Sequence, residues 1–269
     1  MDYENQFLNY CNGAIWKDDT PPKLLKSLSC IAFNDMKKEK TKSKNLIRIC
    51  GQSGSGKTTQ LLEGVKRITE EKKLKPVIIA VRNFATYHPH YNELINMYGK
   101  AEIRERTNGF ALKLLCFTLI KFITSGYFVV MDITLLSSEF EKIVFNLLNE
   151  NGYKINYLIM SVPRMQSDMF IQKRMQTSLS EGSRVVYKSS ADYFYDVLDE
   201  GILYLTQTDK ISNAVIYSAY HKDPRYYGPV KDCYPIFYAC RKRIEKIVFG
   251  EKELLEAKIE FFRKNINFT

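Results

Sequence analysis

The stretch LIRICGQSGSGKTTQLL, residues 46–62, says more about the fold than any other part of the chain. Its first five residues, LIRIC, form a β-prone run, which predicts a short buried strand over 46–50. A glycine-rich turn follows at once, and apolar residues then recur over 61–68 at the spacing of one helix face. The turn matches the pattern G-x-x-x-x-G-K-[ST] at every fixed position. The stretch therefore predicts a strand, a phosphate-binding turn and a helix, in that order.

This turn has the residue types that a phosphate group requires. Glycines let backbone N–H groups converge on phosphate oxygens, because they lack the Cβ that blocks close approach. The start of the following helix adds partial positive charge. Lys57 is predicted to contact the β- and γ-phosphates, and the Thr58 hydroxyl to ligate Mg²⁺. The nucleotide is predicted to be ATP, with GTP as a second option, and the alternative is a flexible Gly/Ser loop without a ligand. The predicted nucleotide-binding residues are Gly51, Gln52, Ser53, Gly54, Ser55, Gly56, Lys57, Thr58 and Thr59.

Further apolar runs alternate with helical patterns along the chain. Strands are predicted over 77–81, 128–131, 155–162 and 214–218, and helices over 108–124, 138–150 and from Pro163 through Arg174. Short, continuously apolar strands alternating with helices are typical of a parallel sheet covered on both faces. The predicted fold class is α/β: a P-loop kinase-like parallel sheet flanked by helices, with helical additions at both ends.

This pattern predicts that the chain divides into three segments. Residues 1–44 are predicted to be an N-terminal extension with one or two helices, broken at Thr20-Pro21-Pro22. Residues 45–220 are the expected kinase-like domain. Residues 221–269 are an expected C-terminal helical region packed on it, amphipathic over 236–260, with Ile244, Ile247 and Val248 facing inward.

Local signals mark the ends of the helix over 138–150. Ser138 followed by Glu141 resembles a capping box, in which the serine begins a helix and the glutamate bonds back to it. Asn151-Gly152 is a typical helix end. The sequence therefore predicts a helix that begins at Ser138 and ends before Gly152.

The composition is that of an ordinary globular chain of 269 residues, 45% hydrophobic and 26% charged. No uncharged apolar run reaches the roughly 18 residues that a membrane span needs, and the first residues, MDYENQFLNY, do not resemble a secretory signal. Six cysteines form no CxxC pair, which favours a reducing compartment. A cytoplasmic protein without a membrane partner is expected.

The net charge of +10 favours an anionic ligand, which could be a nucleotide, a nucleic acid or an acidic protein. A solvated basic surface explains the same charge equally well. No zinc-finger spacing or RGG tract accompanies it, so a nucleic-acid partner is not expected. Charge alone does not decide between these alternatives.

Three residues outside the turn are candidates for phosphoryl transfer. Asp132 ends the run FVVMD at the edge where parallel sheets gather ligands, and it is predicted to contact Mg²⁺ through water or to accept a proton from a substrate hydroxyl. A strand-end acid that caps the next turn is the alternative. Arg174 and Arg184, the latter within SLSEGSRVVYK, are candidates to stabilise the anionic transition state. No N-K-x-D base-reading motif of GTPases is present.

An ordered set of motifs resembles the zeta toxin family, the P-loop kinases of bacterial toxin–antitoxin systems. The set comprises GQSGSGKT, FATYHPHYNEL, GYFVVMDIT, NGYKINYLIMSVPR, QKRMQTS and SRVVYKSSAD. The resemblance implies an ATP-dependent kinase that phosphorylates a hydroxyl of UDP-N-acetylglucosamine or a related UDP-sugar. It also implies a small helical antitoxin as a protein partner that blocks the nucleotide site.

The same resemblance assigns roles to single positions. Lys57 and Thr58 match the family's phosphate and Mg²⁺ residues. Asp132 and Thr134 stand where the family has a substrate-binding Glu and Thr. Arg174 and Arg184 match its two phosphate-clamping arginines, so the predicted catalytic set is Lys57, Asp132, Arg174 and Arg184.

The chain is a divergent member by this comparison. Arg82 occupies the position of the family's general base, an Asp, and Ala80 nearby is not acidic either. Cys116 replaces a Glu on the buried helix, and Leu136 replaces an Arg. Arginine cannot act as a base at neutral pH, and Asp132 is the best-placed substitute. Two alternatives remain open: a degenerate zeta-like fold that binds nucleotide or a protein without catalysis, and a nucleic-acid or nucleotide kinase.

Overall fold

The structure of the protein is a computed structural model, which describes residues 1–13, 18–179, 188–209, 212–243 and 249–268. In this part of the chain, six strands form one sheet in the order β2-β3-β1-β4-β5-β6. Neighbours among the first five in this order are parallel, and β6 runs antiparallel to β5. The strands are β1 (Asn45–Cys50), β2 (Val77–Ile79), β3 (Val129–Asp132), β4 (Lys154–Met160), β5 (Asn213–Tyr217) and β6 (Tyr226–Pro229).

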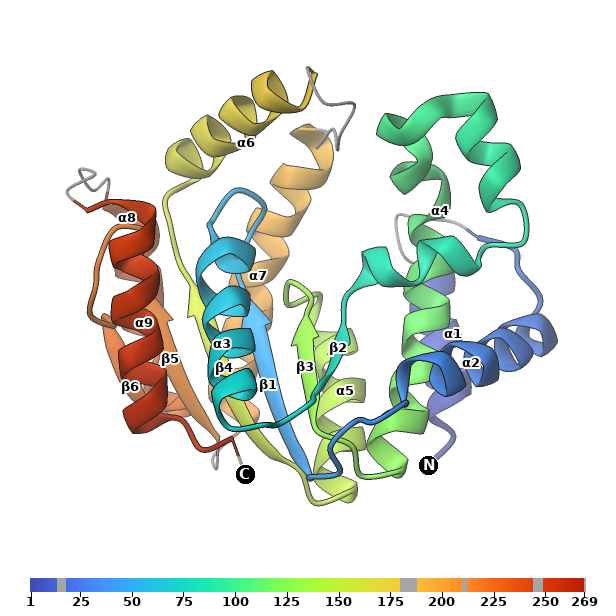
Figure 1. The fold of residues 1–269 in the computed structure, drawn as a ribbon, viewed down its shortest axis with the longest axis horizontal. Helices are drawn as coiled ribbons and strands as arrows, with labels where there is room; N and C mark the ends of the chain where they lie inside the picture. The colour runs from blue at the N-terminus through green and yellow to red at the C-terminus, as the bar shows by residue number, and fades with distance from the viewer. Residues whose placement is uncertain (14–17, 180–187, 210–211, 244–248, 269) are drawn as a thin grey trace.

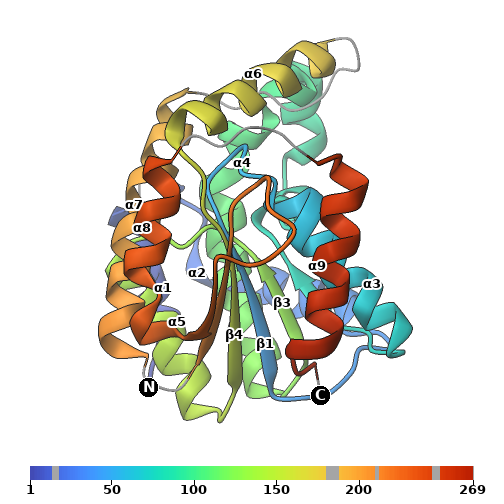
Figure 2. The ribbon, with the colours of Figure 1, turned by 90° about the vertical axis from the view of Figure 1, so that its left-hand side faces the viewer.

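Helices cover both faces of the sheet, which confirms the predicted α/β class. Figure 2 shows α3 and α9 on one side of the strands and α5, α7 and α8 on the other. The helices are α1 (Tyr3–Gly13), α2 (Pro22–Met36), α3 (Glu63–Glu71), α4 (Tyr91–Thr124), α5 (Ser138–Glu150), α6 (Arg164–Leu179), α7 (Lys188–Thr208), α8 (Tyr234–Lys242) and α9 (Glu251–Asn265).

The central strand β1 shows why the sheet is buried on both faces. Its residues alternate between two hydrophobic clusters: Leu46 and Cys50 belong to the larger one, which α1, α2, α4, α5 and α7 cover. Ile47 and Ile49 belong to the smaller one, under α3 and α9. Every residue of β1 is buried. A strand buried on both faces is the pattern expected for a parallel sheet between two helical layers.

The carboxyl ends of the parallel strands lie at one edge of the sheet. Above this edge, α6 and the first part of α4 rise on opposite sides (Figure 1). Segments that follow β1, β2 and β3 meet there, because parallel strands end at the same edge. The fold therefore gathers the turn after each of these strands into one region.

Helix α4 extends well beyond the predicted 108–124. It begins at Tyr91, and a break in helical geometry at Gly99, with φ 76° and ψ 170°, bends its first part away from the rest. Its segment Glu105–Thr124 is long and apolar enough to cross a membrane, but 83% of the most apolar window is buried inside the protein. Burial in a globular core explains the same composition.

The structure differs from the predictions more at the C-terminal end of the chain than at the N-terminal end. In the N-terminal extension, α1 and α2 form, and α2 begins at Pro22, where the proline break was expected. The C-terminal region is not purely helical, because β6 extends the sheet past residue 220 and α8 and α9 are separate helices. The predicted inward residues Ile244, Ile247 and Val248 lie outside the described residues.

The predicted capping box at the start of α5 is wrong. The N-cap is Ser137, and it makes no side-chain capping bond. Ser138 instead donates its backbone N–H and its hydroxyl to Glu200 of α7. Glu141 accepts from the N–H of Leu136 and from Arg48. Ser138 and Glu141 therefore bond to residues from other parts of the chain and not to each other. The predicted end of the helix at Asn151-Gly152 is confirmed.

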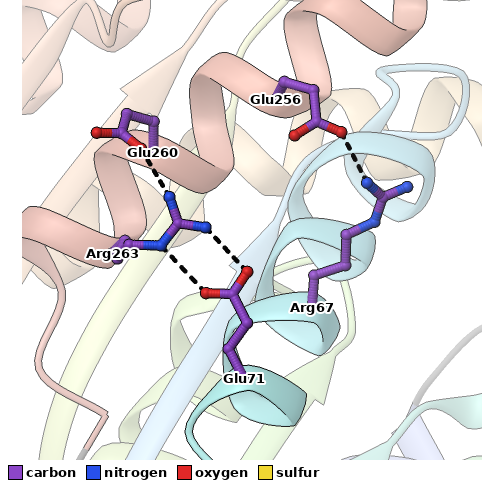
Figure 3. A network of polar contacts seen from close by, with 5 residues as sticks. All are labelled: Arg67, Glu71, Glu256, Glu260 and Arg263. Carbon is purple, nitrogen blue, oxygen red and sulfur yellow. Dashed lines mark hydrogen bonds and ion pairs between the residues drawn. The ribbon is translucent and has the colours of Figure 1, made fainter.

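Ion pairs join α3 to α9 across the surface (Figure 3). Arg263 approaches Glu71 with Nε at 3.1 Å and Nη2 at 2.9 Å, and Arg67 Nη1 lies 2.8 Å from Glu256. These side chains are about half exposed, so each pair adds less than about 1 kcal/mol. Burial beneath them, where Phe262 packs against Gly64, contributes more to holding α9 in place.

Lys258 of α9 is fully buried, and its ammonium donates to the carbonyl of His221 at 3.1 Å. Burial lowers the pKa of Lys258 to about 8, so the folded state releases this proton at a lower pH than the unfolded chain does. Stability therefore rises with pH between about 8 and 10.5. We expect Lys258→Met to be more stable than wild type at pH 7, and this advantage to shrink by up to about 3 kcal/mol by pH 10.5. Urea unfolding of both proteins across this range tests it; a difference independent of pH contradicts it.

Candidate active site

The turn after β1 has the backbone geometry that its sequence requires. Gly54 and Gly56 adopt φ values of 76° and 86°, which favour glycine. A Cβ added to Gly54 would lie 2.4 Å from the carbonyl oxygen of Ser167 in α6. The turn leads directly into a π-helical segment, Lys57–Leu62, that continues as α3. Strand, turn and helix thus follow the predicted order.

Lys57 and Thr58 stand at the start of this helix. The Lys57 ammonium lies 3.3 Å from the carbonyl oxygen of Gln52, so its side chain folds back over the turn. Thr58 is exposed, and Thr59 donates its hydroxyl to the carbonyl of Gly56 at 3.2 Å. An ammonium and a hydroxyl at a helix start are suited to a phosphate group and its cation.

One pocket brings the turn together with the segments that follow β2 and β3. Of the predicted site residues, Lys57, Thr58, Asp132 and Thr134 all line it. Its lining comprises Ser53, Gly54, Ser55, Gly56, Lys57, Thr58, Thr59, Val81, Arg82, Asn108, Leu112, Asp132, Ile133, Thr134, Leu136 and Phe194.

Asp132 does not stand alone in this pocket. Its Oδ2 lies 2.9 Å from Nη1 of Arg82, which follows β2. The Asp132 side chain is 1% exposed and that of Arg82 is 43% exposed. Asp132 Oδ1 is buried and has no hydrogen-bond partner among the described residues. One carboxylate oxygen therefore balances the arginine, and the other has no hydrogen-bond partner among the described residues.

Thr134 is tied to the phosphate-binding turn. Its hydroxyl donates to the carbonyl oxygen of Gly51 at 2.9 Å, and its side chain is nearly buried. This bond fixes the segment after β3 against the segment after β1. Thr134 thus holds the two halves of the pocket in register, in addition to lining it.

The two predicted arginines are not both placed by the structure. Arg174 belongs to α6, which lies above the turn, but its side chain is outside the described part of the chain. Arg184 falls in 180–187, outside the described residues. Their role in transition-state stabilisation stays a prediction.

A buried ion pair holds in place the segment after β3 that lines the pocket. Arg48 of β1 lies 2.8 Å from Glu141 of α5, and their side chains are 1% and 2% exposed. Glu141 also accepts the backbone N–H of Leu136 at 2.9 Å, in the segment that lines the pocket. Burial raises the pKa of Glu141, and the opposing effect of Arg48 is smaller. The pair therefore anchors the segment after β3 to the central strand.

A second cavity lies on the other side of the turn. Gly54, Ser55, Gly56 and Thr59 line both cavities, so the turn separates them. Phe170 and Tyr220 lie on its wall with ring centroids 5.8 Å apart. The remaining lining residues are Gln60, Lys173, Ala219, Phe249, Gly250, Glu251 and Leu254.

Sequence reasoning missed Arg82 as a partner of Asp132 and did not consider Asn108. Cys116, which replaces a Glu of the family on the buried helix, is fully buried and lines neither of these cavities. The residues of α4 that line the pocket are Asn108 and Leu112. A signal for Asn108 was present, because it is a polar residue at the start of a long apolar stretch. Cys116 lies two turns further along the same helix, in the core.

Acidic, histidine and cysteine side chains do not cluster as a protein-only metal site: within the described ranges, no group of three or more such residues could hold an ion. A divalent cation at this pocket would need nucleotide oxygens as ligands, which is how Mg²⁺ is commonly bound. The protein groups near the turn that suit it are the Thr58 hydroxyl and the Asp132 carboxylate.

Comparison with known families agrees with this arrangement. A sequence model described as "Zeta toxin" matches residues 32–228, well over half of the chain. The chain belongs to the zeta toxin family. This confirms the resemblance drawn from the ordered motifs, and the matched span includes the whole sheet up to Gly228. A family of this kind has a kinase-like P-loop fold, in agreement with the turn described above.

Two curated zeta toxin relatives show how far the similarity extends. The chain is 32% identical to Toxin PezT of Streptococcus pneumoniae over 125 residues, which is 46% of this chain and 47% of that protein. It is 23% identical to Toxin zeta of Streptococcus pyogenes over 184 residues, 67% of this chain and 62% of that protein. The chain thus spans between about half and two thirds of the length of these relatives.

Solved structures share the fold of this zeta toxin family member. The structure of the PezAT chromosomal toxin–antitoxin system of Streptococcus pneumoniae matches with a TM-score of 0.65 at 24% identity, over 91% of this chain and 98% of that one. The complex of AvrRxo1-ORF1 and AvrRxo1-ORF2 with ATP matches with a TM-score of 0.51 at 10% identity, over 89% and 83%. At these identities the likeness concerns the fold.

Proposed function

We propose that the protein is an ATP-dependent kinase that transfers the γ-phosphate to a hydroxyl of a UDP-activated sugar or a related metabolite. The observation that carries this proposal is the pocket that Lys57 and Thr58 line together with Asp132. A phosphate-binding turn and a carboxylate with one unpartnered oxygen are the two groups that such a transfer needs.

The two cavities suggest how the nucleotide lies. The base enters the second cavity, where Phe170 and Tyr220 offer aromatic surface, and the triphosphate crosses the turn toward Lys57. Backbone N–H groups of the turn bind the phosphates, and the Lys57 ammonium balances their charge. The γ-phosphate then faces the segment that carries Asp132. ATP is the expected nucleotide, and GTP is the second option.

Mg²⁺ fits the residues of this turn. The positive φ of Gly54 and Gly56 forms a cradle in which no side chain competes with phosphate oxygens, and Thr58 offers an exposed hydroxyl beside it. When bound, Mg²⁺ neutralises charge that develops on the phosphate oxygens. Thr58 would hold the ion, and the Asp132 carboxylate would assist through water.

Asp132 is the proposed general base at the acceptor end of the pocket. Its Oδ2 is held by Arg82, so the carboxylate has a fixed orientation. Oδ1 accepts the proton of the acceptor hydroxyl while the hydroxyl oxygen attacks the γ-phosphorus, and the bond from the γ-phosphorus to the bridging oxygen of ADP breaks so that ADP leaves. This role replaces the base that Arg82 cannot supply. Arg174 and Arg184 are proposed to stabilise the transferring group.

A small helical antitoxin is proposed as the protein partner, and the cytoplasm as the site of action. The structural neighbours support the partner, because the PezAT structure is named as a toxin–antitoxin system. The free state of all six cysteines supports the compartment. Coexpression with a neighbouring open reading frame, followed by copurification, tests the partner.

Nucleotide binding is the first test of the proposed kinase. Calorimetry of the purified chain with ATP in magnesium buffer should give saturable binding, and Lys57→Ala should weaken it at least about 10-fold, because a charge-assisted bond to phosphate is lost. The matched control is Lys142→Ala, which removes an exposed lysine on α5 away from the pocket. Equal affinity in wild type and Lys57→Ala, or no binding of ATP or GTP, contradicts the proposal.

The Arg82–Asp132 ion pair also supports a second candidate, a nucleotide-binding protein without catalysis, because the pair occupies the acceptor end of the pocket. The two candidates differ in turnover. Incubation with labelled ATP and a panel of UDP-sugars gives a Lys57-dependent phosphorylated product only if the chain is a kinase.

A further inference from the structure

Helix α1 of the N-terminal extension lies antiparallel to α5. Tyr3, at the beginning of α1, lies near Glu150, the last residue of α5. The rings of Phe7 and Tyr10 pack on Phe140, near the start of α5, with centroids 5.6 and 5.1 Å away. The C-terminal end of α1 therefore reaches the start of α5, which directly follows the pocket-lining segment after β3.

The Tyr10 side chain lies beside two residues that are sequence neighbours of the pocket lining. Its hydroxyl is close to the hydroxyls of Ser137 and Tyr193. Ser137 directly follows Leu136. Tyr193 directly precedes Phe194 and contacts its ring, with centroids 5.5 Å apart. Because Leu136 and Phe194 both line the pocket, one side chain of α1 connects the segment after β3 with α7 next to the pocket.

A second contact joins the N-terminal extension to α4. Lys113 of α4 donates its ammonium to the carbonyl oxygen of Asp18, and the Asp18 carboxylate lies 3.7 Å from the same nitrogen. Both side chains are largely buried, so water screens their attraction less than it does at the surface. Lys113 directly follows Leu112, the apolar residue that α4 contributes to the pocket.

Three apolar residues of the pocket lining, Leu112, Leu136 and Phe194, are here called the apolar wall. They belong to three elements: α4, the segment after β3, and α7. Each has a sequence neighbour that contacts the N-terminal extension. Because protein interiors are close-packed, a buried group that contacts several elements limits how far these elements shift relative to one another. The extension therefore restrains the apolar wall.

The phosphate-binding turn is restrained by a different part of the chain. Gln52 donates its side-chain amide to the carbonyl oxygen of Val162 at 2.6 Å, and the Ser167 hydroxyl donates to the carbonyl oxygen of Ser53. Val162 follows β4, and Ser167 belongs to α6. A change in the N-terminal extension is therefore expected to act on the acceptor end of the pocket and to leave the phosphate-binding turn in place.

We propose that the N-terminal extension is a positioning element of the acceptor site, in which Tyr10 and Asp18 hold the apolar wall in place. This inference rests on the proposed kinase function. Neither residue lines the pocket, so both act through the wall. Both precede residue 32, where the match to the zeta toxin model begins, and the family assignment therefore gives them no role. Acceptor affinity depends on the extension, and nucleotide affinity does not.

The first test needs no ligand. Tyr10→Phe keeps the packing on Phe140 and removes the hydroxyl. Tyr3→Phe is the matched control, because Tyr3 is 7% exposed, against 8% for Tyr10, and lies on the same helix but near the other end of α5. Hydrogen–deuterium exchange of the full chain should be faster than in wild type for peptides covering 133–137 and 192–195 in Tyr10→Phe, and unchanged there in Tyr3→Phe.

Calorimetry then measures the effect on the acceptor. A non-hydrolysable ATP analogue with Mg²⁺ is titrated first, so that a failure of the proposed kinase function shows as absent nucleotide binding. On the loaded protein, Tyr10→Phe should bind UDP-N-acetylglucosamine about 3- to 10-fold more weakly, the effect of one lost hydrogen bond. Asp18→Asn, which removes the charge beside Lys113, should act in the same direction. Affinity for the ATP analogue should stay unchanged, and Tyr3→Phe should bind both ligands as wild type does.

Two results would overturn the proposal. One is wild-type exchange of both wall peptides in Tyr10→Phe. The other is an equal loss of acceptor affinity in Tyr10→Phe and Tyr3→Phe, or an equal loss for the acceptor and the ATP analogue, since either shows a general effect on the fold. If the wild-type protein does not bind the nucleotide or the sugar, the exchange result alone decides whether the extension holds the wall.

Discussion

Asp132→Asn is expected to reduce the turnover number by about 10²- to 10⁴-fold, the usual contribution of a general base. The amide has nearly the same shape and can still contact Arg82, but it cannot accept the proton of an acceptor hydroxyl. Because the transition state of phosphoryl transfer is loose, residual activity should remain. Single-turnover measurements with labelled ATP and UDP-N-acetylglucosamine separate this chemical step from product release.

Nucleotide affinity provides the internal control for this variant, because Asp132 lies on β3 rather than in the phosphate-binding turn. Affinity for the ATP analogue should change less than about 3-fold, since no direct hydrogen bond to the nucleotide is removed. Asp232→Asn, an exposed aspartate in the 3₁₀ turn after β6, is the matched reference. Wild-type turnover in Asp132→Asn would show that another group accepts the proton.

Glu141→Leu is expected to destabilise the protein by about 3–5 kcal/mol, because it leaves the Arg48 guanidinium charged and buried without its partner. Arg48 is 1% exposed and cannot reach water without disturbing β1. The variant also removes the acceptor of the Leu136 N–H, so the segment after β3 should lose its fixed position. Urea unfolding monitored by circular dichroism measures the loss.

Two further variants distinguish the loss of the buried ion pair from other causes of destabilisation. The double variant Arg48→Met/Glu141→Leu should recover much of the lost stability, because neither buried charge remains. Glu256→Leu removes an exposed partner of Arg67 and should change stability by less than about 1 kcal/mol. If Glu141→Leu is no more destabilising than Glu256→Leu, the buried pair does not anchor the pocket.

The phosphate-binding turn was predictable because all of its requirements are local. Glycines at 54 and 56 satisfy backbone angles within the turn itself, and the strand and helix are immediate neighbours in sequence. The five parallel strands were predictable for a related reason, since burial on both faces leaves a continuous apolar run that is visible without knowing the neighbours.

Features that depend on strand order were not predictable from one sequence. The contact between Arg82 and Asp132 joins residues 50 positions apart and exists because β2 lies next to β3. At the start of α5, Ser138 and Glu141 bond to Glu200 and Arg48 in place of each other. Strand β6 is a short edge strand with alternating exposure, so it lacks the apolar run that identified the others.

The division of the pocket among chain segments has an evolutionary consequence. In the proposed kinase, the part of the turn that lines the pocket for the phosphate donor is one continuous stretch, residues 53–59, whereas the acceptor end comes from segments after β2 and β3 and from α4. Single substitutions at the acceptor end can therefore change which metabolite is modified without altering the use of the donor. Members of a lineage with this fold can therefore evolve toward different acceptor metabolites while they keep the same nucleotide as phosphate donor.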